Sequence, residues 1–197
     1  MKAKSVKVLG LLALSFVSIG FLMQNIPAYA NNGYGTHTAP QFGSGPWITY
    51  TAGLTIDFTP FDISNHTQTI KTQTIFVGYP TDIKLKIFHQ ATPQYIQHVI
   101  VNLNVRGTDP QPSQSDTWLE WDKQDGFTVH DPGKFFKNVS VTTTYDSQFM
   151  YLTFHINAQK PIGTTDMIIT SWDKQLSTSV ANVLDAFKIK YLPFQFS

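Results

Sequence analysis

Apolar and polar residues alternate at every second position over long stretches, and this most constrains how the chain folds. Between residues 48 and 58, apolar side chains take the even positions and mostly polar ones the odd positions. Residues 95–106 repeat the pattern, with Val99, Val101 and Leu103 on one face. Because successive side chains of a strand point to opposite faces of a sheet, these segments are predicted to be strands with one buried face.

Similar segments recur along the chain, separated by turn residues. Strands are predicted at 48–58, 68–77, 83–87, 95–106, 117–122, 127–129, 139–143, 150–156, 167–172 and 183–191. Asp125-Gly126 is a strong hairpin-turn signal, and loops are expected around Pro60 and Pro93. Helical turns are expected only near Phe135 and at 179–182. The spacing predicts an all-β, Ig-like/Greek-key β-sandwich, with a cupredoxin-like or jelly-roll barrel as the alternative.

The first 30 residues read as a secretory signal helix. Lys2, Lys4 and Lys7 precede an apolar run from Val8 to Met23, and Ala28-Tyr29-Ala30 forms a small-x-small cleavage site. The run is shorter than the roughly 20 residues of a bilayer span, so cleavage before Asn31 is expected. The predicted organisation is a signal peptide at 1–30, a flexible or extended leader at 31–46 and one sandwich domain at 47–197.

Charge and cysteine content narrow the classes of function. Cleavage would remove three of the 14 basic residues and none of the 13 acidic ones, so the net charge would change from +1 to −2 (11 − 13). Arg106 is the single arginine, and nucleic-acid binding needs a dense basic footprint, so no nucleic-acid partner is expected. The chain has no cysteine, which excludes a disulfide scaffold and thiolate metal sites. No segment after the signal is apolar enough to span a membrane.

One stretch carries short motifs that point to a family. They are Ile96-Gln97-His98-Val99, Ser115-Asp116-Thr117-Trp118, His130-Asp131-Pro132, Phe135-Phe136, Lys160-Pro161-Ile162, Asp166-Met167-Ile168-Ile169 and Trp172-Asp173. In these motifs the stretch from Ile96 to Asp173 resembles uncharacterised secreted β-sandwich proteins of ammonia-oxidising archaea. The resemblance implies a surface-exposed β-sandwich and assigns no activity. Some such proteins carry an apolar C-terminal sorting tail, whereas this sequence finishes at Pro193-Phe194-Gln195-Phe196-Ser197 without one.

Histidines are the first candidate metal ligands. In the absence of cysteine, a copper or zinc site would use imidazoles and carboxylates. His98 and His155 lie on the polar faces of two predicted strands and would face each other if those strands paired. His130 and Asp131 could add further ligands. The alternative interpretation is four hydrogen-bonded or solvated surface residues, because no H-x-H or H-x-x-x-H spacing is present.

Acidic residues gather between the middle strands and are candidate ligands for a calcium ion. They are Asp109, Asp116, Glu120, Asp122, Asp125 and Asp131. Calcium takes several converging oxygen ligands, but the spacing here lacks a D-x-D-x-D-G loop, and ordinary turn aspartates explain it equally. No catalytic motif is present: neither G-x-S-x-G, H-E-x-x-H, a P-loop nor G-x-G-x-x-G occurs. The chain is therefore expected not to be an enzyme.

Sequons and aromatic residues complete the candidate sites. Asn65 and Asn138 stand in N-x-S/T sequons and are candidate glycosylation sites. Trp118 and Trp121 belong to one short strand, where they are either core or part of an exposed patch for a carbohydrate or a protein. Phe149 and Tyr151 are open to the same two interpretations, with core favoured.

These features predict a non-enzymatic extracellular or cell-surface protein with a structural, adhesive or assembly role. Its partners would be other cell-envelope proteins or copies of itself, with segments 31–46 and 187–196 as candidates for edge pairing between subunits. Two alternatives remain open at this stage: an exported copper- or zinc-binding protein that uses His98 and His155, and a carbohydrate-binding module.

Overall fold

A computed structural model describes residues 38–43, 45, 52–105 and 110–193. The predicted signal helix, and the predicted strand residues 48–51, lie outside the described residues. Within the described part, extended strands dominate, and two short 3₁₀ turns, η1 (Pro93–Tyr95) and η2 (Pro112–Gln114), interrupt them. No helix of the described part has the length and apolar character needed to cross a membrane.

The first sheet is built around β6 and β11. Its strand order is β10-β11-β6-β2-β3, and a short β1 also pairs with β6. The bounds are β1 Gln41–Phe42, β2 Leu54–Ile56, β3 Thr59–Phe61, β6 Pro80–Phe88, β10 Phe136–Tyr145 and β11 Phe149–Ala158. All of these pairings are antiparallel. Strand β1 lies within the segment predicted as a leader, so part of that segment contributes to the sheet.

The second sheet is built around β7 and β12. Its strand order is β4-β13-β12-β7-β8-β9, and β5 also pairs with β13. The bounds are β4 Thr67–Thr69, β5 Gln73–Phe76, β7 Ile96–Val105, β8 Thr117–Asp122, β9 Gly126–His130, β12 Ile162–Asp173 and β13 Thr178–Lys190. Strands β4 and β5 run parallel to β13, whereas the other pairs are antiparallel.

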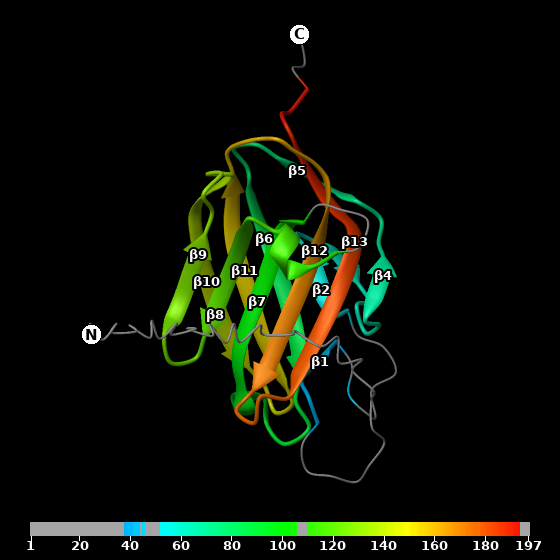
Figure 1. Cartoon of the computed structure of the whole chain (residues 1–197), viewed down its shortest axis with the longest axis vertical. Helices are drawn as coiled ribbons and strands as arrows, with labels where there is room; N and C mark the ends of the chain where they lie inside the picture. The colour runs from blue at the N-terminus through cyan, green and yellow to red at the C-terminus, as the bar shows by residue number, and fades with distance from the viewer. Residues whose placement is uncertain (1–37, 44, 46–51, 106–109, 194–197) are drawn as a thin grey trace, which may run out of the picture.

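The chain crosses between the two sheets in a defined order. It leaves β6 for β7, β8 and β9 of the second sheet, returns to β10 and β11, and finishes in β12 and β13. A variable-type immunoglobulin sandwich has the same order, with strands A, B, E and D facing G, F, C, C′ and C″. In Figure 1, β9 and β10 lie along one side of the sandwich, and β4 and β13 lie along the other. The predicted Ig-like β-sandwich is therefore confirmed.

The core lies between the sheets and consists of every second side chain of the long strands. On β6 these are Ile83, Leu85 and Ile87, all fully buried. The two sheets contribute further buried residues: Leu54, Ile56, Val99, Val101, Leu103, Leu119, Met150, Leu152, Phe154, Met167, Ile169, Ala181, Val183, Phe187 and Ile189. The alternation seen in the sequence is thus the alternation between core and outer face.

Several sequence-based expectations are wrong in detail. The predicted strand 68–77 is two strands, β4 and β5, separated by residues 70–72. Residues 179–182 form part of β13 and no helical turn, because all four pair with β12, which favours the extended backbone there. Pro60, expected in a loop, lies in β3, an edge strand whose outer side needs no N–H donor. No helical turn forms at Phe135.

The outer face of β7 carries polar residues that are largely covered. The exposed fractions of His98, Asn102 and Asn104 are 7%, 6% and 2%. The loop before β8 covers one end of this row, since Asn104 Nδ2 donates to Asp116 Oδ1 at 3.1 Å. Three polar side chains on the outer face of β7 are therefore buried, while Ile100 on the same face stays half-buried.

The fold makes a direct prediction about the core. Phe154 is fully buried on β11, and its ring centroid lies 5.9 Å from that of Phe127 on β9. Phe154→Ala should reduce the free energy of unfolding by about 3–5 kcal/mol, because it leaves a cavity between the sheets. Urea unfolding measures this change. Thr144→Ala, at an exposed position of β10, is the control and should change stability by less than about 0.5 kcal/mol. Equal effects of the two variants would contradict the assignment of the core.

Candidate functional site

The outer face of the second sheet carries an unusual set of side chains, which we name the aromatic face. It is formed by His98 on β7, Trp118, Glu120 and Asp122 on β8, His130 on β9 and Trp172 on β12. The register places Trp172 opposite His98 and His98 opposite Asp122, while Trp118 lies opposite His130. Because strands alternate, Leu119 and Trp121 of β8 point the other way, into the core.

His98 lies at the centre of one row of this face. Its ring stacks on the indole of Trp172, with the ring centroids 3.8 Å apart and the planes 8° from parallel. Nδ1 hydrogen-bonds Asp122 Oδ2 at 2.8 Å, and Nε2 lies 3.1 Å from Glu120 Oε1. The Nε2–Glu120 contact has no hydrogen-bond geometry. His98 is therefore fixed by one hydrogen bond, one aromatic stack and a nearby second carboxylate.

Asp122 joins this histidine to the following hairpin turn. Its Oδ1 accepts the backbone N–H groups of Gln124 at 2.7 Å and Asp125 at 2.9 Å. The backbone hydrogen bond from Asp125 lowers the pKa of the Asp122 carboxyl, and the bonds from His98 and Gln124 add to this against the opposing effect of burial. One carboxylate thus organises both the β8–β9 turn and the orientation of His98.

The second row of the aromatic face holds Trp118 and His130. Their ring centroids are 3.7 Å apart and their planes 18° from parallel. Trp118 is half-buried and His130 is exposed. The sequence did not decide whether Trp118 and Trp121 are core or surface residues, and in the structure the two differ. Trp121 is core at 8% exposure, whereas Trp118 stays on the outer face.

Phe149 and Tyr151 on β11 also differ in burial. Phe149 is 5% exposed and packs against Phe88, with centroids 5.6 Å apart. Tyr151 is half-buried and donates its phenol hydrogen to Asp146 Oδ2 at 2.7 Å. Desolvation, with this hydrogen bond as the second cause, raises the pKa of Tyr151 to about 12. Phe149 therefore matches the favoured core interpretation.

The strand pairing that would bring His98 and His155 together does not occur. His98 is on β7 of the second sheet, and His155 is on β11 of the first, so their strands do not pair. His155 instead lies between Asp82, whose Oδ1 is 2.7 Å from Nδ1, and Thr142, whose Oγ1 is 3.0 Å from Nε2. Sequence spacing could not reveal which sheet each strand joins.

The remaining metal candidates also have separate surroundings. Asp131 Oδ2 accepts the backbone N–H of Phe136 at 2.8 Å, and its Oδ1 is buried without a hydrogen-bond partner. His98, Glu120 and Asp122 do lie together, but the two carboxylates contact opposite nitrogens of the ring. Among the described residues, no group of three or more His, Asp or Glu side chains is arranged to hold a metal ion. A copper or zinc site stays a prediction from the sequence.

Three of the acidic residues considered for calcium accept hydrogen bonds within the chain. Asp122 and Asp131 accept backbone N–H groups, as turn aspartates do, and Asp116 accepts the hydroxyl of Thr117. Asp109 lies outside the described residues. The two sequon asparagines, Asn65 and Asn138, are both exposed, and Asn138 has a positive φ of 51° at a bulge in β10. Calcium binding and glycosylation remain predictions.

One buried histidine–aspartate pair could not be predicted from the sequence. His89, at the end of β6, is 4% exposed, and Asp173, at the end of β12, is 1% exposed. His89 Nδ1 accepts the N–H of Ala91, so Nε2 carries the proton and donates to Asp173 Oδ2 at 3.2 Å. Asp173 Oδ1 accepts the N–H groups of Gln175 and Ser177. The pair ties the two sheets together at one end, which is a structural role.

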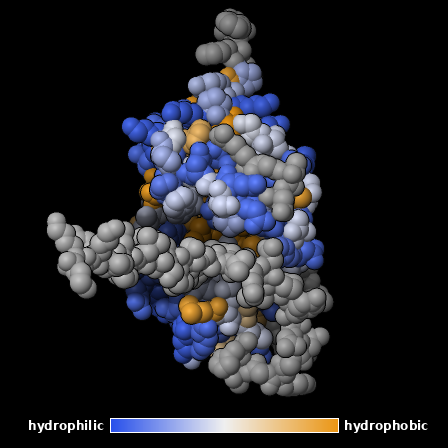
Figure 2. All heavy atoms as spheres, viewed as in Figure 1, coloured by the Kyte–Doolittle hydropathy of each residue, from blue (hydrophilic) through white to orange (hydrophobic). Residues whose placement is uncertain are grey.

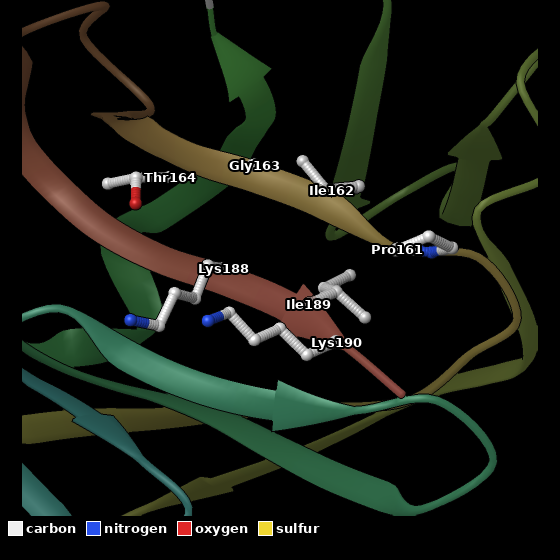
Figure 3. Close-up of a pocket in the computed structure, with 7 residues that line it drawn as sticks. All are labelled: Pro161, Ile162, Gly163, Thr164, Lys188, Ile189 and Lys190. Atoms are coloured by element: carbon white, nitrogen blue, oxygen red, sulfur yellow. The ribbon is translucent and has the colours of Figure 1, made fainter. Parts of the chain in front are cut away.

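An open groove of about 550 Å³ lies between the start of β12 and the end of β13. It is lined by no residue of the aromatic face. Figure 3 shows Lys188 and Lys190 leaving β13 on the same side, with their ammonium groups pointing the same way. A second hollow of about 280 Å³ adjoins it and shares Pro161, Ile162, Gly163 and Thr164. The described residues around these grooves hold no cluster of acid, base and nucleophile.

Comparison with known proteins gives little beyond this. No protein-family description matches the chain, and no curated protein does. A solved structure from a study titled "Structure-based site-directed photo-crosslinking analyses of multimeric cell-adhesive interactions of VGSC beta subunits" aligns at a TM-score of 0.40 and 6% identity. The alignment covers 64% of this chain and 93% of that one. With similarity this low, the assignment of the fold rests on the strand order of the chain itself.

The Asp122 network predicts a stability change with pH. Because the pKa of Asp122 is lowered in the folded state, its contribution is present above its ordinary pKa of 3.8 and is lost as pH falls through the folded value. Asp122→Asn should therefore lower stability at pH 7 by about 1 kcal/mol and reduce the loss of stability on acidification from pH 5 to pH 2. Urea unfolding across this range measures both effects.

Asp125→Asn is the matched control, since Asp125 is exposed in the same turn and its carboxylate forms no hydrogen bond or ion pair with another described residue. It should leave the loss of stability between pH 5 and pH 2 unchanged. If wild type and Asp122→Asn lose the same stability over this pH range, the role given to Asp122 is contradicted.

Proposed function

We propose that the chain is a non-enzymatic extracellular or cell-surface β-sandwich that binds other cell-envelope proteins through the aromatic face. It would act as an adhesive or assembly subunit. The observation that carries this proposal is the pair of histidine–tryptophan stacks, His98–Trp172 and Trp118–His130, on the outer side of one sheet. In an antiparallel sheet with one solvated face, the side chains on that face are normally polar.

The composition of the aromatic face suits recognition of a protein surface. Tryptophan is enriched at the centres of protein interfaces because it supplies a large apolar area together with a polar N–H. Here each indole stacks on a histidine, and the histidine stacked on Trp172 is itself held by its hydrogen bond to Asp122. A preorganised face loses less conformational entropy on binding than a flexible one. Glu120, Asp122 and His130 supply polar groups around the indoles.

The shape of the surface also favours a large partner. The two grooves described above are lined by residues 161–165 and 188–190 together with Asn104 and Phe135, and by no residue of the aromatic face. Small-molecule sites are usually concave, whereas the aromatic face is the outer side of a β-sheet. Figure 2 shows hydrophobic residues scattered in small groups on a largely hydrophilic surface. An interaction of moderate strength, centred on a few aromatic residues, is consistent with such a surface.

The proposed location rests on the N-terminal sequence. The signal-like residues 1–30 and the resemblance to secreted archaeal sandwiches both favour export. The resemblance itself remains a proposal, and residues 1–37 lie outside the described part.

Carbohydrate binding is the second candidate, and one observation favours it. Burial of both Trp118 and Trp121 would have argued against it, but only Trp121 is in the core. Trp118 retains an accessible part of its ring beside His130 and Glu120, and aromatic platforms with nearby polar groups can also stack on sugar rings.

Binding of the purified chain to cell envelopes tests the proposal. Trp118→Ala should weaken binding at least tenfold, because removal of a central interface tryptophan costs about 2 kcal/mol or more. Phe58→Ala is the matched control, since Phe58 is 98% exposed in the β2–β3 turn and far from this face in sequence and sheet. It should bind like wild type. Thermal unfolding of each variant checks that the fold is retained.

Pretreatment of the envelopes separates the two candidates. Protease digestion should abolish binding if the partner is a protein, and periodate oxidation of sugars should leave it intact. Binding that survives protease but not periodate would favour the carbohydrate alternative. Equal binding by Trp118→Ala and Phe58→Ala would contradict both.

A further inference from the structure

The edges of the two sheets are not equally protected against pairing with another chain. Strand β3 has three residues and includes Pro60, β4 and β5 are short and interrupted, and β9 has five residues. Short strands and proline are the devices by which proteins protect sheet edges. Strand β10 has ten residues, and among the described residues it pairs with β11 alone.

The hydrogen-bonding pattern identifies the groups on the free side of β10. Asp146 N–H donates to Phe149 O at 3.0 Å, so the backbone groups of Asp146 point toward β11. The direction alternates along an antiparallel strand. The N–H and C=O groups of Val141, Thr143 and Tyr145 therefore point away from β11, toward the open edge.

The sequence of this edge offers no barrier to pairing. Residues 140–145 contain no charged residue, glycine or proline, and the bulge in β10 lies before Ser140. Ser140, Thr142 and Thr144 are exposed, while Val139 and Val141 pack partly against the core. Six regular residues are enough for an added strand, and threonine pairs across strands favourably.

The two ends of the edge carry opposite charges. Exposed Lys137 lies near the start of β10, and Asp146 follows its last residue. Asp146 stays ionised because backbone hydrogen bonds from Gln148 and Phe149 and the phenol of Tyr151 lower its pKa. In an antiparallel pair of identical strands, the start of each strand lies beside the end of the other. Lys137 of each copy would then approach Asp146 of its partner.

We propose that β10 pairs antiparallel with β10 of a second copy across a two-fold axis, so that the first sheets of both copies form one continuous sheet. The charge complementarity of the two ends favours a second copy over an unrelated segment. An edge contact of six residues buries less than the roughly 1,600 Å² of a standard interface, so the dimer is weak and depends on concentration. The proposal does not rest on the proposed function, because it uses the other sheet.

Sedimentation equilibrium of the full chain, produced without glycans because of the sequon at Asn138, tests the proposal. Wild type should show a monomer–dimer equilibrium. Thr142→Lys should raise the dissociation constant at least tenfold, since it places two like charges near the axis. Lys137→Glu should also weaken the dimer, by an amount that shrinks at high salt. Thr59→Lys, an exposed threonine on edge strand β3, is the control and should leave the constant unchanged.

A cysteine cross-link gives a second readout. The chain has no cysteine, so Thr142→Cys introduces a single thiol near the proposed axis. Mild oxidation should give a covalent dimer, whereas Thr59→Cys should not. A wild-type chain that is monomeric at every concentration overturns the proposal. A dimer that resists Thr142→Lys and is not cross-linked by Thr142→Cys also overturns it, because its interface must lie elsewhere.

Discussion

Burial of alternate aliphatic side chains between β6 and β11 on one side and β7 and β12 on the other is the interaction on which the structure depends. Immunoglobulin sandwiches of antibodies place a disulfide between two strands that correspond here to β6 and β12. This chain has no cysteine, and fully buried residues such as Leu85, Met167 and Ile169 occupy these strands. Packing and strand pairing therefore carry the stability that a disulfide would supplement.

Because the inner side chains supply this packing, the outer faces and edges of the sheets can take other roles. Once the inner positions of β7, β8 and β12 are committed to the core, their outer positions can hold His98, Trp118 and Trp172 without loss of packing. The same holds for β10, where the side chains of Val139 and Val141 pack against the core while the backbone N–H and C=O groups of alternate residues point away from β11. The two proposed interaction surfaces thus belong to different sheets, and either could function without the other.

Much of the fold could be predicted from the sequence, because alternation reports directly on which side chains are buried. The strand at 117–122 was predicted with the bounds of β8, and Gly126 has the positive φ of 87° that its turn signal implied. Partners far apart in sequence could not be predicted. The separation of His98 from His155, the division of 68–77 and the strand at 179–182 all depend on which strands become neighbours.

The candidate site was only partly visible in the sequence for the same reason. Trp118 and His98 stood out as residue types, but their stacking on His130 and Trp172 needs the β7–β12 and β8–β9 registers. The buried pair of His89 and Asp173 joins residues 84 positions apart and has no local signal. Turn aspartates such as Asp122 resemble calcium ligands in sequence, and only their hydrogen bonds reveal that they serve the backbone.

Native-state hydrogen exchange of the free protein tests the central claim most directly. If packing between four central strands holds the sandwich together, the slowest amides should be those of β6, β7, β11 and β12, and they should exchange through global unfolding. Amides of β3, β4 and β5 should exchange faster through local opening. Slowest exchange in those short edge strands, or fast exchange throughout β6 and β12, would contradict the account.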